Sequence, residues 1–166
     1  MKIKGKRKKV ALVLFVVALI TLVWIFGNSL KDGASSTEQS SKMMAFLRPV
    51  IDKVLSLFDV SASDTQIHHF VRKAAHFSEY ALLGFLLMGA MLVFRFSDRK
   101  APLVVFPVCL LAAAIDESLQ VFSPGRGPSR ADVLLDFCGA VFGIGCACLL
   151  LLLLSAILKK KNGSMG

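Results

Sequence analysis

The chain has little negative charge and lacks the residue balance of an ordinary soluble domain. Its 166 residues include 11 acids against 20 lysines and arginines, which leaves a formal net charge of +9, and 55% of the residues are hydrophobic. A chain this apolar and this basic is typical of a small integral membrane protein. The composition therefore argues against a soluble globular domain.

Disulfide and metal-binding patterns are also missing. None of the four cysteines lies at metal-ligand spacing from a histidine, and all four lie in apolar segments. A thiol in such a place usually behaves as a small hydrophobic side chain. We therefore expect packing roles and no disulfide for Cys109, Cys138, Cys146 and Cys148.

Long apolar stretches are plentiful instead. Crossing a bilayer takes roughly 20 mostly apolar residues, and the candidates are residues 10–27, 74–94, 101–122 and 133–158. The first follows a lysine-rich tail, as in a secretory signal peptide, but it continues into "WIFGNSL" without a small-residue cleavage site. The sequence thus predicts an all-α bundle of four transmembrane helices, the first of them uncleaved.

Basic residues are distributed unevenly between the two ends of these helices. With the N-terminus inside, the tail 1–9, the turn 95–100 and the tail 159–166 carry twelve basic residues and one acid, Asp98. Because cytoplasmic segments of membrane proteins are enriched in lysine and arginine, we expect both termini in the cytoplasm. The basic tails then set the topology and contact anionic lipid, and we expect no nucleic-acid partner.

The long connection between the first two spans, residues 28–67, contains too little apolar material for a domain of its own. It opens with the polar "GASSTEQSS", whereas residues 42–58 have apolar side chains at helical spacing and predict an extracytoplasmic amphipathic helix. Ser63 or Asp64 can cap the next helix, which we expect to continue to Phe94. The segment 68–158 then forms a three-helix core.

Ionisable side chains interrupt the last three spans at one predicted depth, near the outer leaflet. In the third span Glu117 and Gln120 share a face, with Asp116 about 100° away on the helical wheel. Such groups can merely fasten a bundle, but acids inside a span are costly in lipid and more often form sites. The residues predicted to gather are Arg72, His76, Glu79, Tyr80, Glu117, Gln120, Arg126, Asp132 and Asp136.

These residue types allow two kinds of site. His76 with Glu79 or Glu117 would form a general base with an orienting carboxylate, and Arg72 or Arg126 could hold a phosphate or carboxylate. No serine lies in a recognisable nucleophile turn, and one histidine without an H-E-x-x-H pattern predicts no metal site. Spacing therefore favours a binding pocket over a named reaction.

Two segments, "RKAAHFSEYALLGFLL" and "IDESLQVFSPGRGPSRADVLLDFCGAVFG", carry a family resemblance. They reproduce in order the patterns R-K-x-x-H-F-x-E-Y, D-E-x-x-Q-x-F-x-P-G-R and D-V-x-x-D/N-x-x-G. The chain thus resembles the VanZ-like family of small bacterial membrane proteins. The site residues that this resemblance implies are Arg72, Lys73, His76, Glu79, Tyr80, Glu117, Gln120, Arg126, Asp132, Asp136 and Gly139.

The family takes its name from a member associated with teicoplanin resistance in Gram-positive bacteria. The resemblance therefore implies a multi-pass protein of the bacterial plasma membrane with a cell-envelope role, reduced susceptibility to glycopeptides among its effects, and it names no cofactor. The favoured function is an outward-facing pocket for an anionic envelope lipid, a lipid-linked wall intermediate or a glycopeptide. The alternatives are a hydrolase or transferase with His76 as general base, and a non-catalytic modulator of another envelope protein.

Overall fold

Five helices make up the described part of the chain, which contains no strand. The computed structural model describes the backbone of residues 2–31, 33–57, 59, 61–94, 100–124 and 129–163, and side chains within these ranges from 5 to 157, except 33 and 34. The helices are α1 (Lys2–Ser29), α2 (Gly33–Leu57), α3 (Asp64–Val93), α4 (Ala101–Gln120) and α5 (Arg130–Gly163). The all-α class predicted from the sequence is confirmed.

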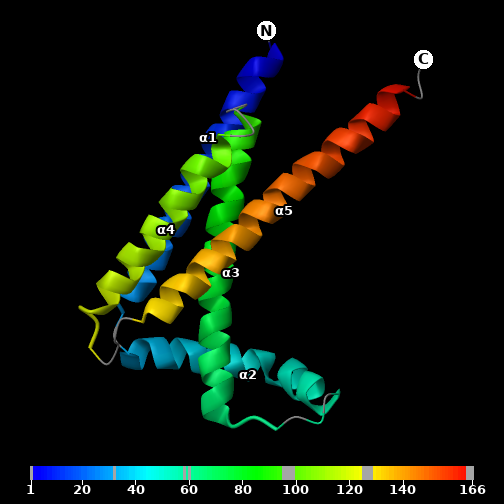
Figure 1. Ribbon diagram of the computed structural model, residues 1–166. Coiled ribbons are helices and arrows are strands. Elements are labelled where there is room, and N and C mark those ends of the chain that lie inside the picture. The colour runs from blue at the N-terminus through cyan, green and yellow to red at the C-terminus, as the bar shows by residue number, and fades with distance from the viewer. Residues whose placement is uncertain are drawn as a thin grey trace.

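Four of the helices are long and apolar enough to cross a membrane. These segments are Gly5–Ser29, Asp64–Val93, Ala101–Gln120 and Arg130–Ile157. They form a bundle with both chain ends at one end of it, while α2 lies across the opposite end, nearly perpendicular to α3 (Figure 1). The amphipathic helix is thus separate from the four candidate spans.

Helix α2 begins at Gly33 rather than at residue 42, so the polar segment predicted to be a loop is helical. The hydroxyls of Ser40 and Ser41 donate to the carbonyl oxygens of Ser36 and Thr37, one turn earlier, at 2.9 and 2.8 Å. An ion pair between Glu38 and Lys42 adds a second contact at the same spacing. These local bonds satisfy polar side chains on the helix surface, so the polar composition of the segment is compatible with a helix.

Helix α3 begins with a capping box. The Ser63 hydroxyl accepts from the backbone N–H of Gln66 at 3.3 Å, and the Gln66 side chain accepts from the Ser63 N–H at 2.9 Å. Ser63 is therefore the cap, one of the two residues predicted for this role. The helix has 30 residues, or about 45 Å, against a hydrocarbon core of roughly 30 Å.

The closest packing in the bundle is between α3 and α5, which run in the same direction and cross each other (Figure 1). A Cβ added at Gly139 would overlap the carbonyl oxygen of Phe77, and one at Gly143 would overlap that of Ala81. Small residues at a contact allow two helices to approach this closely. We call this contact the α3–α5 seam.

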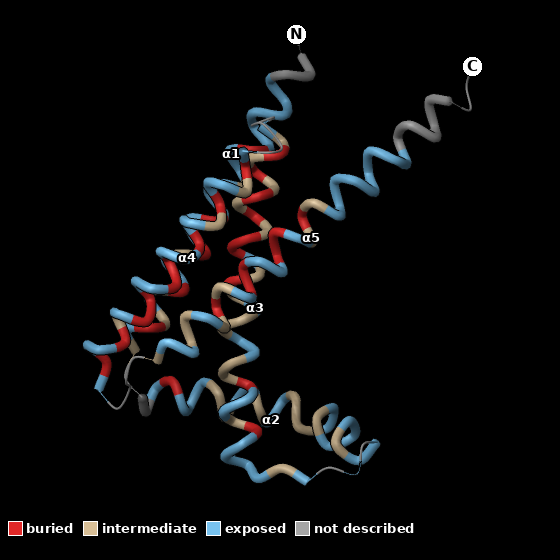
Figure 2. Tube along the Cα trace, viewed as in Figure 1, coloured by how far each residue is buried: buried red, intermediate tan, exposed pale blue. Residues whose placement is uncertain are grey.

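Burial is concentrated where α3 meets its neighbours. Figure 2 shows buried residues along the middle of α3 and on the adjoining sides of the other helices. Tyr80, Met88, Cys109 and Ala140 are among the core side chains from α3, α4 and α5. Residues 149–157 of α5 are all exposed, a length of apolar helix that a bilayer would cover.

Candidate functional site

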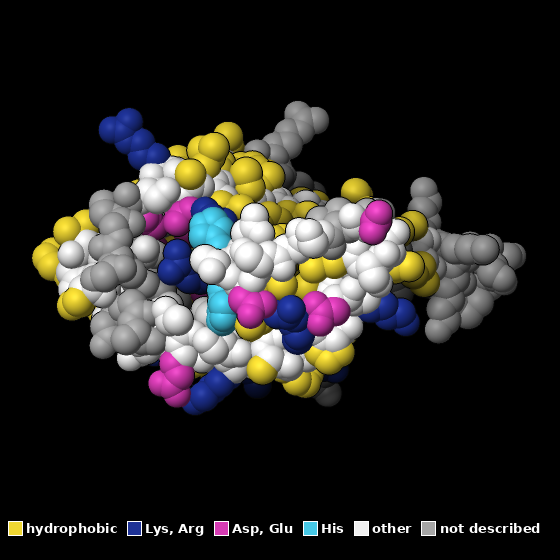
Figure 3. All heavy atoms as spheres, turned by 90° about the horizontal axis from the view of Figure 1, so that it is seen from below, with side chains coloured by type: hydrophobic (Ala, Val, Ile, Leu, Met, Phe, Trp, Pro, Cys, Tyr) yellow, Lys and Arg dark blue, Asp and Glu magenta, His cyan; other side chains and the backbone are white. Residues whose placement is uncertain are grey.

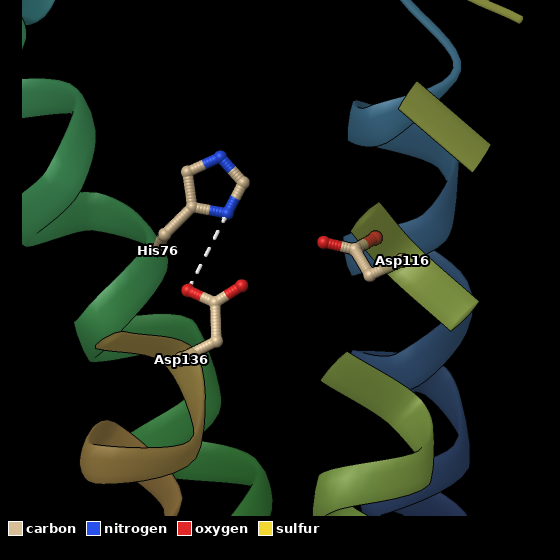
Figure 4. Close-up of side chains that lie close together, drawn as sticks. All are labelled: His76, Asp116 and Asp136. Carbon is tan, nitrogen blue, oxygen red and sulfur yellow. Dashed lines mark ion pairs between the residues drawn. The ribbon is translucent and has the colours of Figure 1, made fainter. Parts of the chain in front are cut away.

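Three titratable side chains from three different helices meet near the α2 end of the bundle. They are His76 of α3, Asp116 of α4 and Asp136 of α5, and one potential ligand atom from each lies within 4.8 Å of the other two. Figure 4 shows them pointing toward one another around a common space. We call these residues the His–Asp–Asp cluster.

The cluster is deeply buried. Asp116 has no exposed surface and Asp136 is 1% exposed, while the His76 side chain is 18% exposed. The Nδ1 atom of His76 lies 3.9 Å from Oδ1 of Asp136, which is too far for a hydrogen bond. Two carboxylates beside an imidazole in a buried place are a charge arrangement that needs a compensating proton or cation.

A cavity of about 20 Å³ adjoins the cluster, with room for about one water molecule. Its wall includes six residues of the predicted site, namely the cluster residues His76 and Asp136 together with Arg72, Lys73, Gln120 and Asp132. At its edge the Lys73 ammonium donates to the Asp132 carboxylate, joining α3 to α5. The structure therefore brings six of the predicted residues around one small polar cavity.

Arg72 lies between this cavity and a second one. The second cavity, about 90 Å³, lies between α1, α2 and α3, and both Arg72 and His76 line it as well. The Arg72 side chain is half-buried, yet among the described residues it makes no hydrogen bond or ion pair. A guanidinium in this position has several donors directed toward space that a ligand could fill.

Glu79 faces the second cavity and is bonded to α1. Its Oε1 atom accepts from the indole N–H of Trp24 and from the amide of Asn28, both at 3.1 Å. Lys31 in turn donates to Asn28 at 2.8 Å and lies over the Trp24 ring. Glu79 thus fastens α3 to α1 and is not one of the carboxylates of the cluster.

Glu117 lies on another side of α4. It is buried, accepts from the backbone N–H of Ser129, and lines a hollow of about 400 Å³ that Arg130 also borders. This contact ties the end of α4 to the start of α5. Arg126, predicted to bind an anion, lies outside the described residues.

Two further residues, Tyr80 and Asp116, are buried close to the polar cavities. The Tyr80 ring is fully buried in the core, and its hydroxyl has no hydrogen-bond partner among the residues described. Helical spacing puts Asp116 about 100° from the predicted polar face of α4, yet it and not Glu117 joins the cluster. The signal that could have found it is its spacing of four from Gln120, which places both residues on one face of a helix as well as a spacing of three does.

An apolar groove of about 530 Å³ runs beside these polar groups, between the second half of α2 and the first turns of α3. Its wall is mostly hydrophobic and includes Val50, Val54, Ile67 and Phe70. Seen from the α2 end, histidine, acidic and basic side chains gather near the middle of the face, with hydrophobic side chains around them (Figure 3). The 90 Å³ polar cavity and the apolar groove thus both lie between α2 and α3.

Four helices long and apolar enough to cross a membrane, three of which share a buried polar cluster, define the class: a multi-pass helical membrane protein. The VanZ/LLP1 family model matches residues 12–153, from α1 through most of α5. The chain therefore belongs to the VanZ/LLP1 family, and the match includes every residue of the predicted site. No curated protein and no solved structure matches the chain.

Proposed function

We propose that this family member binds an anionic envelope lipid at the outer leaflet. Its headgroup would lie in the two cavities beside Arg72, and an acyl chain would lie in the apolar groove between α2 and α3. The observation that carries the proposal is the half-buried Arg72 guanidinium, which lines both cavities without a partner among the described residues.

The charge of the ligand follows from Arg72. Hydrogen bonds to a charged group contribute about 1.5–3 kcal/mol each, and a guanidinium can bind phosphate through two of them. Two of the acids nearby are already engaged, Glu79 by Trp24 and Asn28, and Asp132 by Lys73, and Arg72 itself makes no hydrogen bond or ion pair with any described acid. An anion is thus the ligand that Arg72 can accept without displacing an existing contact.

The lipid character follows from the groove. Val71 and Arg72 line the second cavity, and Ile67, one turn earlier on α3, lines the groove. A molecule with an anionic head and an apolar chain would therefore meet both surfaces along one helix. Lipid-linked wall intermediates have the same two parts, and this shared chemistry is what the proposal names.

The experiment compares wild type with Arg72→Gln after delipidation in detergent. Titration with phosphatidylglycerol and with phosphatidylcholine, followed by native mass spectrometry, should show a preference for the anionic lipid of tenfold or more in the wild type. Arg72→Gln should weaken phosphatidylglycerol binding ten- to a hundredfold, the effect of about 1.4 to 3 kcal/mol. Arg130→Gln is the matched control, because Arg130 is exposed at the start of α5 and borders neither cavity.

A second variant tests the groove. Val54 is 47% exposed on its wall, so Val54→Asp places a charge against the acyl chain without disturbing the core. It should weaken phosphatidylglycerol binding and leave glycerol phosphate binding unchanged, whereas Arg72→Gln should weaken both. Equal binding of both lipids, or wild-type binding by Arg72→Gln, would sink the proposal.

The orientation and the antibiotic effect belong to the same proposal. With both termini in the cytoplasm, the α2 end and its cavities face outward, where glycopeptides meet wall intermediates. Expression in a susceptible Gram-positive host should then raise the teicoplanin concentration needed to stop growth. Arg72→Gln should abolish that rise at equal protein level, and an unchanged effect would separate resistance from lipid binding.

The His76–Asp136 pair favours a second candidate, a hydrolase or transferase acting on a lipid-linked substrate with His76 as general base. Against it, the small cavity has no serine, threonine or cysteine in its described wall, so an attacking group would have to be a water molecule. Turnover of a lipid diphosphate that is lost in His76→Gln, with lipid binding retained, would establish catalysis. Binding without turnover in the wild type supports the first proposal.

A further inference from the structure

We propose that the His–Asp–Asp cluster binds a single divalent cation, with His76, Asp116 and Asp136 as its protein ligands. The class of ion is set by the donors: imidazole suits zinc and other transition metals, and carboxylate suits manganese, magnesium and calcium. One imidazole with two carboxylates points to Zn²⁺ or Mn²⁺. This site differs from the sequence-based expectation of no metal, in which the possible partners of His76 were Glu79, Glu117 and Asp132, and neither Asp116 nor Asp136.

The geometry fits one ion. Ligand nitrogen and oxygen atoms lie about 2.0–2.2 Å from zinc, so two ligands on opposite sides of the ion are about 4.2 Å apart. The separation of 3.9 Å between Nδ1 of His76 and Oδ1 of Asp136 falls within this limit. The three ligand atoms all lie within 4.8 Å of one another, so any pair wider than the limit would have to move closer on binding the ion.

The Asp136 carboxylate supplies the independent observation. It is 1% exposed, and neither of its oxygens accepts a hydrogen bond from a described residue. Figure 4 shows it aimed into the space between His76 and Asp116. A buried carboxylate without hydrogen bonds is destabilising by several kcal/mol unless a cation or proton compensates it, and a metal ion in that space would coordinate it directly.

The surroundings suit a bound ion in two further ways. The cavity of about 20 Å³ that His76 and Asp136 border has room for one water molecule at an open coordination position. The α3–α5 seam lies next to the His76–Asp136 pair and holds the backbone of both helices there, because Gly139 lies against the Phe77 carbonyl. The ligands are therefore held by rigid elements, as metal sites require.

The proposal does not rest on lipid binding. A cation in the cluster would add positive charge next to Arg72, but its presence can be measured in lipid-free protein. The test uses full-length protein without a histidine tag, stripped with a chelator, dialysed, and titrated with ZnCl₂ or MnCl₂ in detergent. Metal content is read by inductively coupled plasma mass spectrometry, and affinity by calorimetry.

Wild type should retain one equivalent of Zn²⁺ or Mn²⁺ and gain thermal stability on binding it. His76→Ala and Asp136→Asn should each weaken binding at least tenfold. His69→Gln is the matched control, since His69 is an exposed histidine on the same helix, and Glu79→Gln controls for a carboxylate outside the cluster. Both should bind as wild type does.

Asp116→Asn keeps the test decisive if another variant fails to fold. It preserves the shape of a fully buried side chain and removes its charge, so it should fold, melt at or above the temperature of metal-free wild type, and lose the metal-dependent rise in melting temperature. Wild type that binds no stoichiometric metal would overturn the proposal. So would unchanged affinity in both Asp116→Asn and Asp136→Asn.

Discussion

Helix α3 meets two neighbours in opposite ways. Against α5 it is packed backbone to backbone, at Gly139 and Gly143, with the buried Asp136 in the same contact. Against α2 it leaves an apolar groove of about 530 Å³ and a polar cavity of about 90 Å³. One side of α3 is thus closed and the other is open.

The difference in packing gives the two sides of α3 different mechanical properties. Close packing of small residues fixes the relative positions of groups on α3 and α5, because a shift of one helix would bring backbone atoms into overlap. Helix α2 makes far fewer contacts with α3 than α5 does, and a low density of contacts is a feature of a region that opens at lower free energy. The rigid side can hold the His–Asp–Asp cluster while the open side admits a ligand.

The largest expected effect is a loss of stability on disrupting the α3–α5 seam. Gly143→Ala adds a methyl group where it overlaps the Ala81 carbonyl, so α3 and α5 must move apart. We expect a loss of roughly 3 kcal/mol of unfolding free energy, the upper end of the usual range for overpacking, measured by denaturation in detergent. Gly145→Ala is the control on the same helix, since nothing lies within 4 Å of its added Cβ.

Gly145→Ala should be neutral or slightly stabilising, because alanine has a higher helix propensity than glycine. If Gly143→Ala and Gly145→Ala have equal free energies of unfolding, α3 and α5 are not packed closely at Gly143. The contrast between a tightly packed and an open side of α3 would then be wrong.

A smaller effect is expected for the Lys73–Asp132 ion pair, which crosses from α3 to α5 at the edge of the small cavity. Its side chains are 31% and 28% exposed, so solvent screens part of the attraction. A double-mutant cycle of Lys73→Met and Asp132→Asn should give a coupling free energy of about 1 kcal/mol. A coupling near zero would show that the seam positions the helices without this pair.

Sequence reasoning predicts most of the fold because its signals are local. Apolar length gives the four candidate spans, and the capping residues Ser63 and Asp64 give the start of α3 to within one residue. It places the start of α2 too late, because serine and glycine favour turns on average. In this segment the hydroxyls of Ser40 and Ser41 bond to carbonyl oxygens of the preceding turn, so these polar side chains are satisfied within the helix.

The candidate site is harder to predict because it depends on the rotation of α4 about its axis. Asp116 and Glu117 are adjacent and both buried, yet one joins the cluster and the other bonds to Ser129. Above them α4 is apolar on all sides, so its sequence contains no stripe that marks the inner face. The small residues Ala112 and Ala113 are buried in the structure, but nothing in their spacing distinguishes them from the exposed apolar residues of the same helix.

On the open side, removing Arg48 should change local rather than global stability. Arg48 bonds to Asp52 on α2 and to Asp64 at the start of α3, and these partners raise the pKa of its guanidinium, the Asp64 hydrogen bond most. In Arg48→Gln we expect faster hydrogen exchange across residues 33–57 with an unchanged melting temperature. Arg130→Gln should leave exchange in α2 as it is, and a lower melting temperature in Arg48→Gln would mean that the two sides unfold together.

The smallest effect concerns pH. The hydrogen bond from Lys42 holds the pKa of Glu38 below its ordinary value of 4.5. The pair therefore supports α2 fully above pH 4.5, and its contribution is lost as the pH falls through the lowered pKa of the folded state. Wild type should show faster exchange in α2 than at neutral pH, after correction for intrinsic rates, only below about pH 4.5.

Glu38→Gln should abolish this pH dependence without changing the melting temperature. A response that begins at pH 6 would instead point to histidine and away from the Glu38–Lys42 pair.

The seam also determines which changes the protein can accumulate over evolution. Because Gly139 and Gly143 face backbone carbonyls rather than side chains, no substitution on α3 can make room for a larger residue there. Helix α2 has no such restriction, and its groove is lined by side chains that can be exchanged one at a time. Substitutions in α2 can therefore reshape the groove, whereas the α3–α5 seam admits no larger residue at these two glycines.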